Sequence, residues 1–249
     1  MEGSVKTVLI TGGASGMGLL LGQCYAKEGA NVVLADIDKQ TLDARVEEIC
    51  AYHENVIGVQ VDVRNYEEVV AVRDAAVERF GSIDILINCA GGAETRIHNM
   101  HATFHENPIE IYDFGIDVNL KGAMYFDHAV LAQMAKQNSG VIIHLGSITG
   151  EEGSYNAVAY AASKSALMYG VTKSIAQAGA PYNVRCVCIA PGPVLTRPAM
   201  ANMKTMLGRA AEVQEIVDMI MYAASDKCAF LNGVHILMDG GRNVMFNRT

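Results

Sequence analysis

Seven short apolar stretches recur along the chain, and segments with helical periodicity lie between them. The stretches are 5–10, 31–35, 56–61, 83–88, 140–145, 184–189 and 234–238. Continuous apolar runs of this length are typical of strands buried on both faces, as in a parallel sheet. The alternation predicts an α/β fold, with about seven parallel strands in one doubly wound sheet and helices on both faces. No linker or repeat interrupts residues 1–249, so we expect a single domain.

A glycine-rich turn follows the first apolar stretch. Residues 11–18 read TGGASGMG and precede a helical run that starts near Ser15 or Gly16. Glycines allow the backbone to approach a pyrophosphate closely, and the helix start presents free N–H groups and the positive end of the helix dipole. The order strand, glycine turn, helix therefore favours a nucleotide site over an ordinary turn with no ligand.

The second apolar stretch ends in Asp36, 18 residues after Gly18 (36 minus 18). An acidic residue at about this distance binds the ribose hydroxyls of a dinucleotide. It also repels the extra phosphate of NADP, and no basic neighbour offsets that repulsion, since Lys39 is the first cation after it. We therefore predict NAD as the cofactor. Asp36 is alternatively a cap for the helix that begins near Lys39, a role compatible with the first.

Tyr160 and Lys164 lie four residues apart in a segment rich in helix-forming alanines, 13 residues after Ser147 (160 minus 147). Residues i and i+4 share a helix face. A phenol titrates near pH 10 in water, so it serves as a base at neutral pH only beside a fixed positive charge. Taken alone, such a pair is more often a packed ring and a solvated lysine. Its position downstream of a nucleotide site favours catalysis.

Taken together, these motifs resemble those of the short-chain dehydrogenases/reductases, in the family's order and across nearly the whole chain. They comprise the turn with Gly12, Gly16 and Gly18, the Asn88-Cys89-Ala90-Gly91 turn, Asn119, Ser147, the Tyr160 and Lys164 pair, and residues 191–196 with the sequence PGPVLT. The resemblance implies a Rossmann domain that transfers hydride between a nicotinamide cofactor and a small substrate.

The resemblance also implies residue roles. Tyr160 would exchange the substrate proton, Ser147 would orient the same oxygen, Lys164 would stabilise the phenolate and hold the ribose, and Asn119 would hold a water next to the lysine. The residues expected to contact the cofactor are Gly12, Ser15, Gly16, Met17, Gly18, Asp36, Ile37, Asp62, Val63, Asn88, Ala90, Gly91, Tyr160, Lys164, Pro191, Gly192, Val194 and Thr196.

Departures from the family pattern leave the catalytic groups in place. Cys89 stands where the family often has Asn or Ala, and Val187 stands where many members carry Asn. His144 and Gly146 replace the Asn and Ser that are common before the catalytic serine. An inward-pointing His144 would alter the electrostatics around the site.

Composition narrows the function classes. The net charge is −8 without a basic patch, which disfavours nucleic acid as a partner. No apolar run reaches 18 residues, and the N-terminus lacks a signal-peptide pattern, so we expect neither membrane insertion nor export. Six cysteines without a Cys-x-x-Cys pair favour reduced thiols in the cytoplasm, with Cys186 and Cys188 buried on one strand face.

Several residues around the expected substrate position have open roles. His98, His101 and His105 have near-helical spacing, but their segment is expected to be a loop or frayed helix, so we predict no metal. Glu151, Glu152, Tyr155 and residues 93–98 are expected to flank the substrate, under a short lid from Thr196 to Gly208. The lid methionines Met200, Met203 and Met206 either cover the substrate or, as we prefer, belong to the core of a short helix.

We therefore predict an NAD-dependent oxidoreductase that interconverts a secondary alcohol and a ketone. The first alternative is an NADP-linked 3-oxoacyl thioester reductase, which Asp36 disfavours. The second is a non-catalytic nucleotide sensor or scaffold, which the intact catalytic set disfavours. The family resemblance and the long helical segments 109–136 and 157–178 also predict a homo-oligomer, most simply a tetramer.

Overall fold

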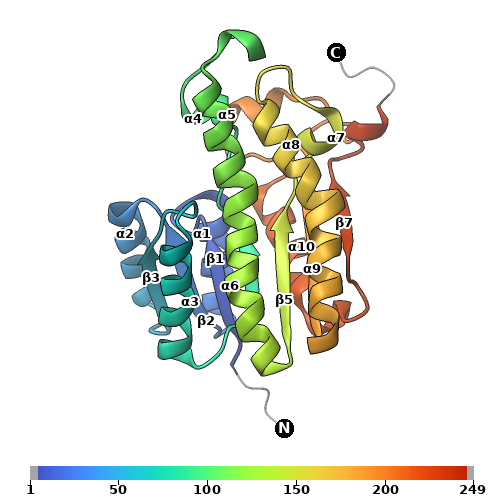
Figure 1. The fold of residues 1–249 in the computed structure, drawn as a ribbon. Coiled ribbons are helices and arrows are strands. Elements are labelled where there is room, and N and C mark those ends of the chain that lie inside the picture. Colours follow the sequence, from blue (N-terminus) through green and yellow to red (C-terminus); the bar gives the residue numbers. More distant parts are fainter. Residues whose placement is uncertain (1–4, 246–249) are drawn as a thin grey trace.

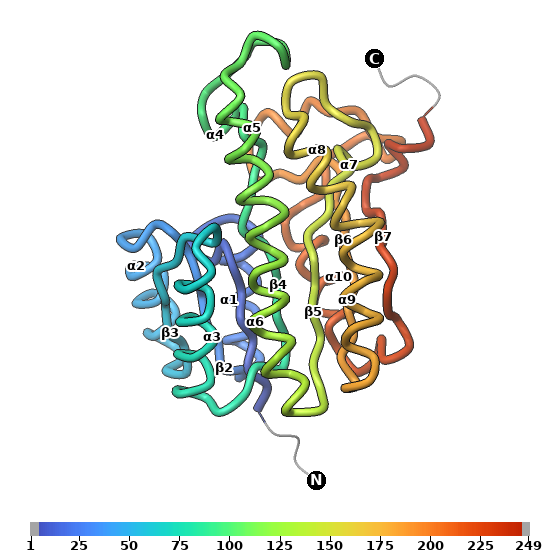
Figure 2. The backbone as a smooth tube through the Cα atoms, in the orientation of Figure 1, coloured from blue at the N-terminus to red at the C-terminus, as the bar shows by residue number. Residues whose placement is uncertain are grey.

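The computed structural model describes residues 5–245 and contains one seven-stranded parallel sheet. Its strands run in the order β3-β2-β1-β4-β5-β6-β7 (Figures 1 and 2). They are β1 (Thr7–Thr11), β2 (Asn31–Asp36), β3 (Val56–Gln60), β4 (Ile85–Asn88), β5 (Gly140–Leu145), β6 (Val184–Pro191) and β7 (Val234–Met238). The predicted fold class is confirmed, and each strand overlaps one of the seven apolar stretches.

Helices cover both faces of the sheet, because alternate residues of each strand point to opposite sides. Val8 and Ile10 pack with helices α1 (Gly16–Lys27), α2 (Lys39–Cys50) and α10 (Val213–Ala224). Leu9 packs with α3 (Tyr66–Phe80), α6 (Gly122–Gln137) and α9 (Thr172–Gly179), which lie in front of the sheet in Figure 1.

Short helices gather at the carboxyl ends of the strands, at the top of Figure 1. They are α4 (Glu94–Ile97), α5 (Ile109–Ile116), α7 (Thr149–Glu152) and α8 (Val158–Ala166). Short 3-10 helical segments lie at Phe104–Glu106, Ala180–Tyr182, Pro198–Asn202, Asp226–Cys228 and Arg242–Val244.

Each of the two expected long helical segments contains a π-helical turn. Asp117–Lys121 joins α5 to α6, and Leu167–Val171 joins α8 to α9. The first turn carries Asn119, and the second begins three residues after Lys164. Such π turns are frequent at functional sites because they re-aim the side chains of an otherwise regular helix.

Two of the cysteines are buried in the sheet. All six cysteines are free, and Cys186 and Cys188 are buried on one side of β6, as predicted. Among residues 5–245, no helix has the length and apolar character that crossing a lipid bilayer requires.

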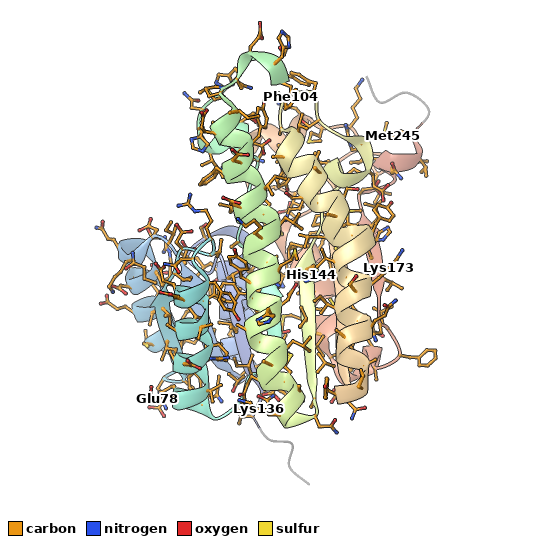
Figure 3. All side chains as sticks on the ribbon, viewed as in Figure 1. Glu78, Phe104, Lys136, His144, Lys173 and Met245 are labelled. Atoms are coloured by element: carbon orange, nitrogen blue, oxygen red, sulfur yellow. The ribbon has the colours of Figure 1, made fainter. Side chains whose placement is uncertain are left out.

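A buried polar network lies between β5 and the helices α6 and α9. The side chain of His144, labelled in Figure 3, belongs to β5. It has no exposed surface. Its Nε2 lies 3.0 Å from both carboxylate oxygens of Asp127, and its Nδ1 lies 2.8 Å from the Thr172 hydroxyl oxygen. That hydroxyl donates its hydrogen to the Leu167 carbonyl at 2.6 Å, so it accepts from Nδ1. Both ring nitrogens therefore donate, which requires an imidazolium paired with a carboxylate.

The electrostatics of the pair point the same way. Burial alone disfavours the charged ring, but the Asp127 carboxylate and the Cys186 thiol outweigh it and hold the pKa of His144 well above its usual range. His144 thus points inward, and its charge is neutralised locally by Asp127.

We predict that this pair makes the fold less stable as the medium becomes alkaline. The folded-state pKa of His144 lies above the unfolded value of about 6.5, so the stabilisation is complete below pH 6.5 and is lost as pH rises toward the folded-state pKa. The slope reaches at most about 1.4 kcal/mol per pH unit. Urea unfolding from pH 6 to 9 measures it.

The control is the double variant Asp127→Asn/His144→Asn, which removes both charges together. Other titrating groups are the same in the two proteins, so the difference between their pH profiles belongs to the pair. Parallel profiles over this range would show that His144 is neutral in the folded protein.

Candidate active site

A cleft of about 850 Å³ opens at the carboxyl ends of the strands. Of the residues expected to bind a cofactor or substrate, it is lined by Gly12, Ser15, Gly16, Met17, Gly18, Asp36, Ile37, Asp62, Val63, Ala90, Gly91, Ser147, Tyr160, Pro191, Gly192, Val194 and Thr196. Asn88, Asn119 and Lys164 do not line it and lie buried behind its wall. One cleft thus joins the glycine turn to the Tyr160 segment.

The glycine turn has a shape that only glycine permits at Gly18. A Cβ atom there would overlap with the carbonyl oxygen of Gly12, and Gly12 itself has a positive φ of 66°. Ser15 lies at the N-cap of α1 without a side-chain hydrogen bond to the helix. The first N–H groups of α1 are therefore left without a side-chain cap next to the cleft, where an anionic group of a ligand fits.

Asp36 is held at the cleft wall by two backbone groups. Its carboxylate accepts hydrogen bonds from the N–H of Ala14 at 3.0 Å and of Asp38 at 3.1 Å. The cap of α2 is Asp38, whose side chain accepts from the N–H of Thr41. The alternative role of Asp36 as the cap of this helix is therefore wrong.

Asp62 is paired with the nearest arginine. Arg64 bonds both oxygens of its carboxylate, at distances from 2.5 to 3.0 Å, and lies 5.1 Å from the centre of the Phe114 ring. The hydrogen bond from Arg64 lowers the pKa of Asp62. The charge of the Arg64 guanidinium is therefore neutralised by the Asp62 carboxylate.

Of the residues expected to be catalytic, Tyr160 and Ser147 line the cleft, while Lys164 lies buried behind them. Tyr160 lines the cleft, and the Nζ atom of buried Lys164 lies 5.5 Å from the centre of its ring. Nζ donates to the Leu145 carbonyl at 2.6 Å, which fixes the lysine against the end of β5. The Ser147 hydroxyl oxygen accepts from the Thr149 N–H at 3.1 Å, so its own hydrogen can be donated into the cleft.

Asn119 supports the loop after β4. Its side chain donates to the carbonyls of Gly115 and Gly92 and accepts from the N–H of Gly92 at 2.8 Å. Asn88 donates to Asp127 at 2.9 Å, which connects this loop to the buried His144 pair. Cys89 lines the cleft, and burial raises its thiol pKa to about 12, so it is a neutral group there.

Glu94 lies in the segment 93–98 that was expected to flank the substrate, but it does not line the cleft, and its role is one that the sequence analysis did not predict. It has no exposed surface, and its carboxylate accepts from the N–H groups of Ala159 and Tyr160, both at 3.0 Å. It thereby caps the helix that carries Tyr160 and Lys164. No local signal marks this cap, because 65 residues separate Glu94 from Ala159.

Three residues expected beside the substrate lie elsewhere. Glu151 bonds Tyr169 and lies 3.6 Å from His235, and Glu152 pairs with Arg242. Tyr155 is 75% exposed and does not line the cleft. The short helix α7 directs both glutamates toward β7 and the C-terminal segment. Ser154, Asn156 and Ala157 line the cleft instead.

The preferred interpretation of the lid methionines is wrong. Met200 and Met203 line the cleft, and Met206 is 64% exposed, so none belongs to the buried core. The short Pro198–Asn202 turn has too few residues to bury a face of its own.

The histidines near α4 are not brought together. The ring of His98 packs against Phe114, and His105 lies beside the hydroxyl of Thr103. Within residues 5–245, no group of three His, Cys, Asp or Glu side chains has the arrangement that a metal ion needs.

The fold and the cleft define an α/β protein of the dinucleotide-binding class, and comparison with known proteins gives its family. The pattern of the family "short chain dehydrogenase" matches residues 6–207. The trans-4-hydroxycyclohexanecarboxylate dehydrogenase of Sinomonas cyclohexanicum is 38% identical, with 95% of this chain and 92% of that protein covered. The protein belongs to the short-chain dehydrogenase/reductase family, whose members are oxidoreductases that use nicotinamide cofactors.

Two further relatives show the breadth of the family. The 3-oxoacyl-(acyl-carrier-protein) reductase of Thermotoga maritima is 33% identical, with 95% of this chain and 97% of that protein covered. A crystal structure of a short chain dehydrogenase from Bacillus anthracis superimposes with a TM-score of 0.88 at 31% identity, covering 97% of this chain and 98% of the other.

We predict that Glu94→Gln destabilises the protein by about 1–3 kcal/mol and lowers kcat. The amide keeps one acceptor oxygen but places an N–H₂ group against the second backbone N–H, which leaves a buried donor unsatisfied. Chemical denaturation and steady-state kinetics measure the two effects.

The matched control is Glu106→Gln. Glu106 also accepts a backbone hydrogen bond, from Thr103, but is exposed and outside the cleft. Equal, small effects of the two substitutions would contradict the role of Glu94 in positioning α8.

Proposed function

We propose that the protein is an NAD-dependent oxidoreductase that interconverts a secondary alcohol and a ketone, with Tyr160 as the general acid and base. The observation that carries the proposal is the position of Tyr160 and Ser147 in the same cleft as the glycine turn and Asp36, with Lys164 buried next to the Tyr160 ring.

The cleft suits a nicotinamide dinucleotide. The uncapped start of α1 and the close approach at Gly18 would hold a pyrophosphate. Asp36 would accept hydrogen bonds from the adenosine ribose and would repel a phosphate on it. Ile37, Asp62 and Val63 would flank the adenine, while Pro191, Gly192, Val194 and Thr196 would contact the nicotinamide end. When bound, the nicotinamide ring supplies the hydride acceptor or donor.

The residues of the protein handle the proton. Tyr160, as phenolate, would take the hydroxyl proton of the alcohol, and would return it when the ketone is reduced. Ser147 would donate its hydrogen to the same substrate oxygen. Lys164 would stabilise the phenolate by its charge, while the Leu145 carbonyl keeps the ammonium in place. Asn119 would position the water next to the lysine and hold the Gly91-Gly92 backbone.

A cyclic secondary alcohol is the substrate class that we favour. The outer part of the cleft carries apolar side chains, among them Ile97, Met200 and Met203, which suit a hydrocarbon ring. The Sinomonas relative, by its name, oxidises a ring hydroxyl. The second candidate, reduction of 3-oxoacyl thioesters, is favoured by the likeness to the Thermotoga reductase. We rank it lower because it usually goes with NADP, which Asp36 would repel.

We also propose a cytoplasmic homo-tetramer that binds neither nucleic acid nor membranes. The family resemblance and the two long helical segments support it, and the exposed side chain of Met124 on α6 is available for a subunit contact. Light scattering at micromolar concentration tests it, and a stable monomer would contradict it. The sequence also offers the apolar run of Val244, Met245 and Phe246 as a possible addition to a subunit contact. Phe246 lies outside the described residues.

Replacing Asp36 with Ser or Arg is expected to relax or invert the choice of cofactor. Either change removes the carboxylate that repels the NADP phosphate, and Arg adds an attractive charge. The ratio of kcat/KM for NAD to that for NADP measures the effect. A parent protein that prefers NADP would overturn the NAD assignment and favour the 3-oxoacyl reductase.

Tyr160→Phe is expected to lower turnover by at least about 10²-fold while NAD binding is nearly unchanged, because the ring is kept and the proton carrier is lost. Lys164→Ala is expected to weaken NAD binding and turnover together and to shift the remaining alcohol oxidation to higher pH. NAD dissociation constants and single-turnover rates against pH measure both.

The chain offers a matched control for these variants. Tyr169 and Lys173 have the same spacing, and the Lys173 Nζ lies 5.9 Å from the Tyr169 ring centre, but neither lines the cleft. Tyr169→Phe and Lys173→Ala are expected to leave NAD binding and rates unchanged. If Tyr160→Phe keeps more than about a tenth of parental turnover, a loss below 1.4 kcal/mol, another residue is the base.

A further inference from the structure

Two arginines line the cleft beyond the catalytic residues. Arg96 comes from α4, and Arg197 directly precedes the Pro198–Asn202 turn. Neither has a carboxylate within ion-pair distance in the part of the chain that the structure describes. Their positive charges therefore face the cleft without a carboxylate from the described chain, although the Arg197 Nη2 atom lies 3.6 Å from the Met200 sulfur.

Most other arginines of the described chain are neutralised or bonded. Arg45, Arg64, Arg73, Arg209 and Arg242 pair with carboxylates, and Arg185 donates to three backbone carbonyls. The acidic residue nearest to Arg96 in its own helix is Glu94, whose carboxylate is used on the N–H groups of α8. Glu94 therefore does not neutralise the charge of Arg96.

The two arginines lie close to each other and to the catalytic phenol. Burial and then the charge of Arg197 lower the pKa of Arg96, while the Tyr160 side chain acts in the opposite direction. The Arg96 guanidinium lies over Gly92, since a Cβ on that glycine would overlap with its Nη2 atom. Both side chains are exposed and line the same cleft. Two like charges on one cleft wall, neither paired with a carboxylate, favour a bound anion.

The adenosine end of the cofactor is expected away from this position. The pyrophosphate would lie at the start of α1, and the adenosine end at Asp36 on β2. Arg96 follows β4, which is separated from β2 by β1, and neighbouring strands are about 4.8 Å apart. Arg197 follows β6, which lies on the same side of β1 as β4, and both arginines share the cleft with Tyr160 and with the apolar side chains Ile97, Met200 and Met203.

We propose that the protein acts on hydroxy acids, whose carboxylate is bound by Arg96 and Arg197 while the carbinol oxygen faces Tyr160 and Ser147. This inference rests on the proposed function. During oxidation, the hydride leaves the carbinol carbon for the nicotinamide of NAD, the hydroxyl oxygen gives its proton to the Tyr160 phenolate, and the C–O bond becomes the C=O bond of the ketone. The carboxylate is unchanged, and it serves to orient the substrate.

The first test measures binding and needs no turnover. Cyclohexanecarboxylate and its neutral analogue cyclohexanecarboxamide are titrated by calorimetry into the protein saturated with NAD. We expect the acid to bind at least tenfold more tightly. The preference should shrink to about twofold in Arg96→Gln and in Arg197→Gln, and remain in the control Arg79→Gln, on the surface helix α3 outside the cleft. Equal binding of acid and amide to the parent would overturn the proposal.

The second test measures kcat/KM for 4-hydroxycyclohexanecarboxylate and the corresponding carboxamide. Each arginine variant should lose at least tenfold with the acid and stay within about twofold with the amide. Equal rates with both substrates in the parent would reject the carboxylate site while leaving the dehydrogenase intact. No oxidation of either compound, or of other alcohols, would reject the proposed function, and the binding test would still decide on the site.

The same variants separate the substrate from the cofactor. The NAD dissociation constant is expected to change by less than twofold in Arg96→Gln and Arg197→Gln. A rise above fivefold with the preference for the acid retained would show that the arginines bind a cofactor phosphate, and would also overturn the proposal.

Discussion

The parallel pairing of β1 with β4 is the constraint on which the candidate site depends. The chain winds outward from β1 to β3 and then crosses back to β4, so the turns after β1 and β4 leave the sheet in opposite directions. Thr11 pairs with Asn88 in this ladder, and the Thr11 hydroxyl oxygen accepts from the N–H of Ala90 at 3.0 Å. This bond connects the glycine turn to the loop that carries Gly91 and Glu94. The two segments that line the cleft after β1 and after β4 are therefore held at a fixed distance from each other.

The helix that carries Tyr160 is fixed at both ends by residues from elsewhere in the chain. Glu94 holds its first N–H groups, and the Leu145 carbonyl holds the Lys164 ammonium near its end. Because the helix is already fixed, its side chains lose little conformational entropy when a ligand binds. The reacting groups then stay in the geometry that the reaction needs. The short helical turn Pro198–Asn202 has no side-chain cap of this kind. The segment after Thr196 supplies Arg197, Met200 and Met203 to the cleft.

The local part of this architecture could be predicted from the sequence. The apolar runs predicted the seven strands. The glycine turn and Asp36 were recognised because they directly follow or end an apolar run, which puts them at strand ends. Long-range contacts could not be predicted. Nothing in the local pattern of Glu94 indicates that it caps a helix 65 residues away. The directions of the Glu151 and Glu152 side chains depend on how α7 is rotated about its axis. Whether Arg96 and Arg197 lack a carboxylate partner depends on the position of every Asp and Glu side chain in the fold.

The buried pair of His144 and Asp127 restricts how this chain can change over time. Loss of either partner alone leaves an uncompensated charge in the core, which typically costs 3–5 kcal/mol and is a large part of the stability of a whole protein. Asn88 also bonds this carboxylate, so the loop beside the cleft shares the damage. A substitution at one of the two positions therefore needs a matching neutral substitution at the other to keep this part of the core free of an unpaired charge.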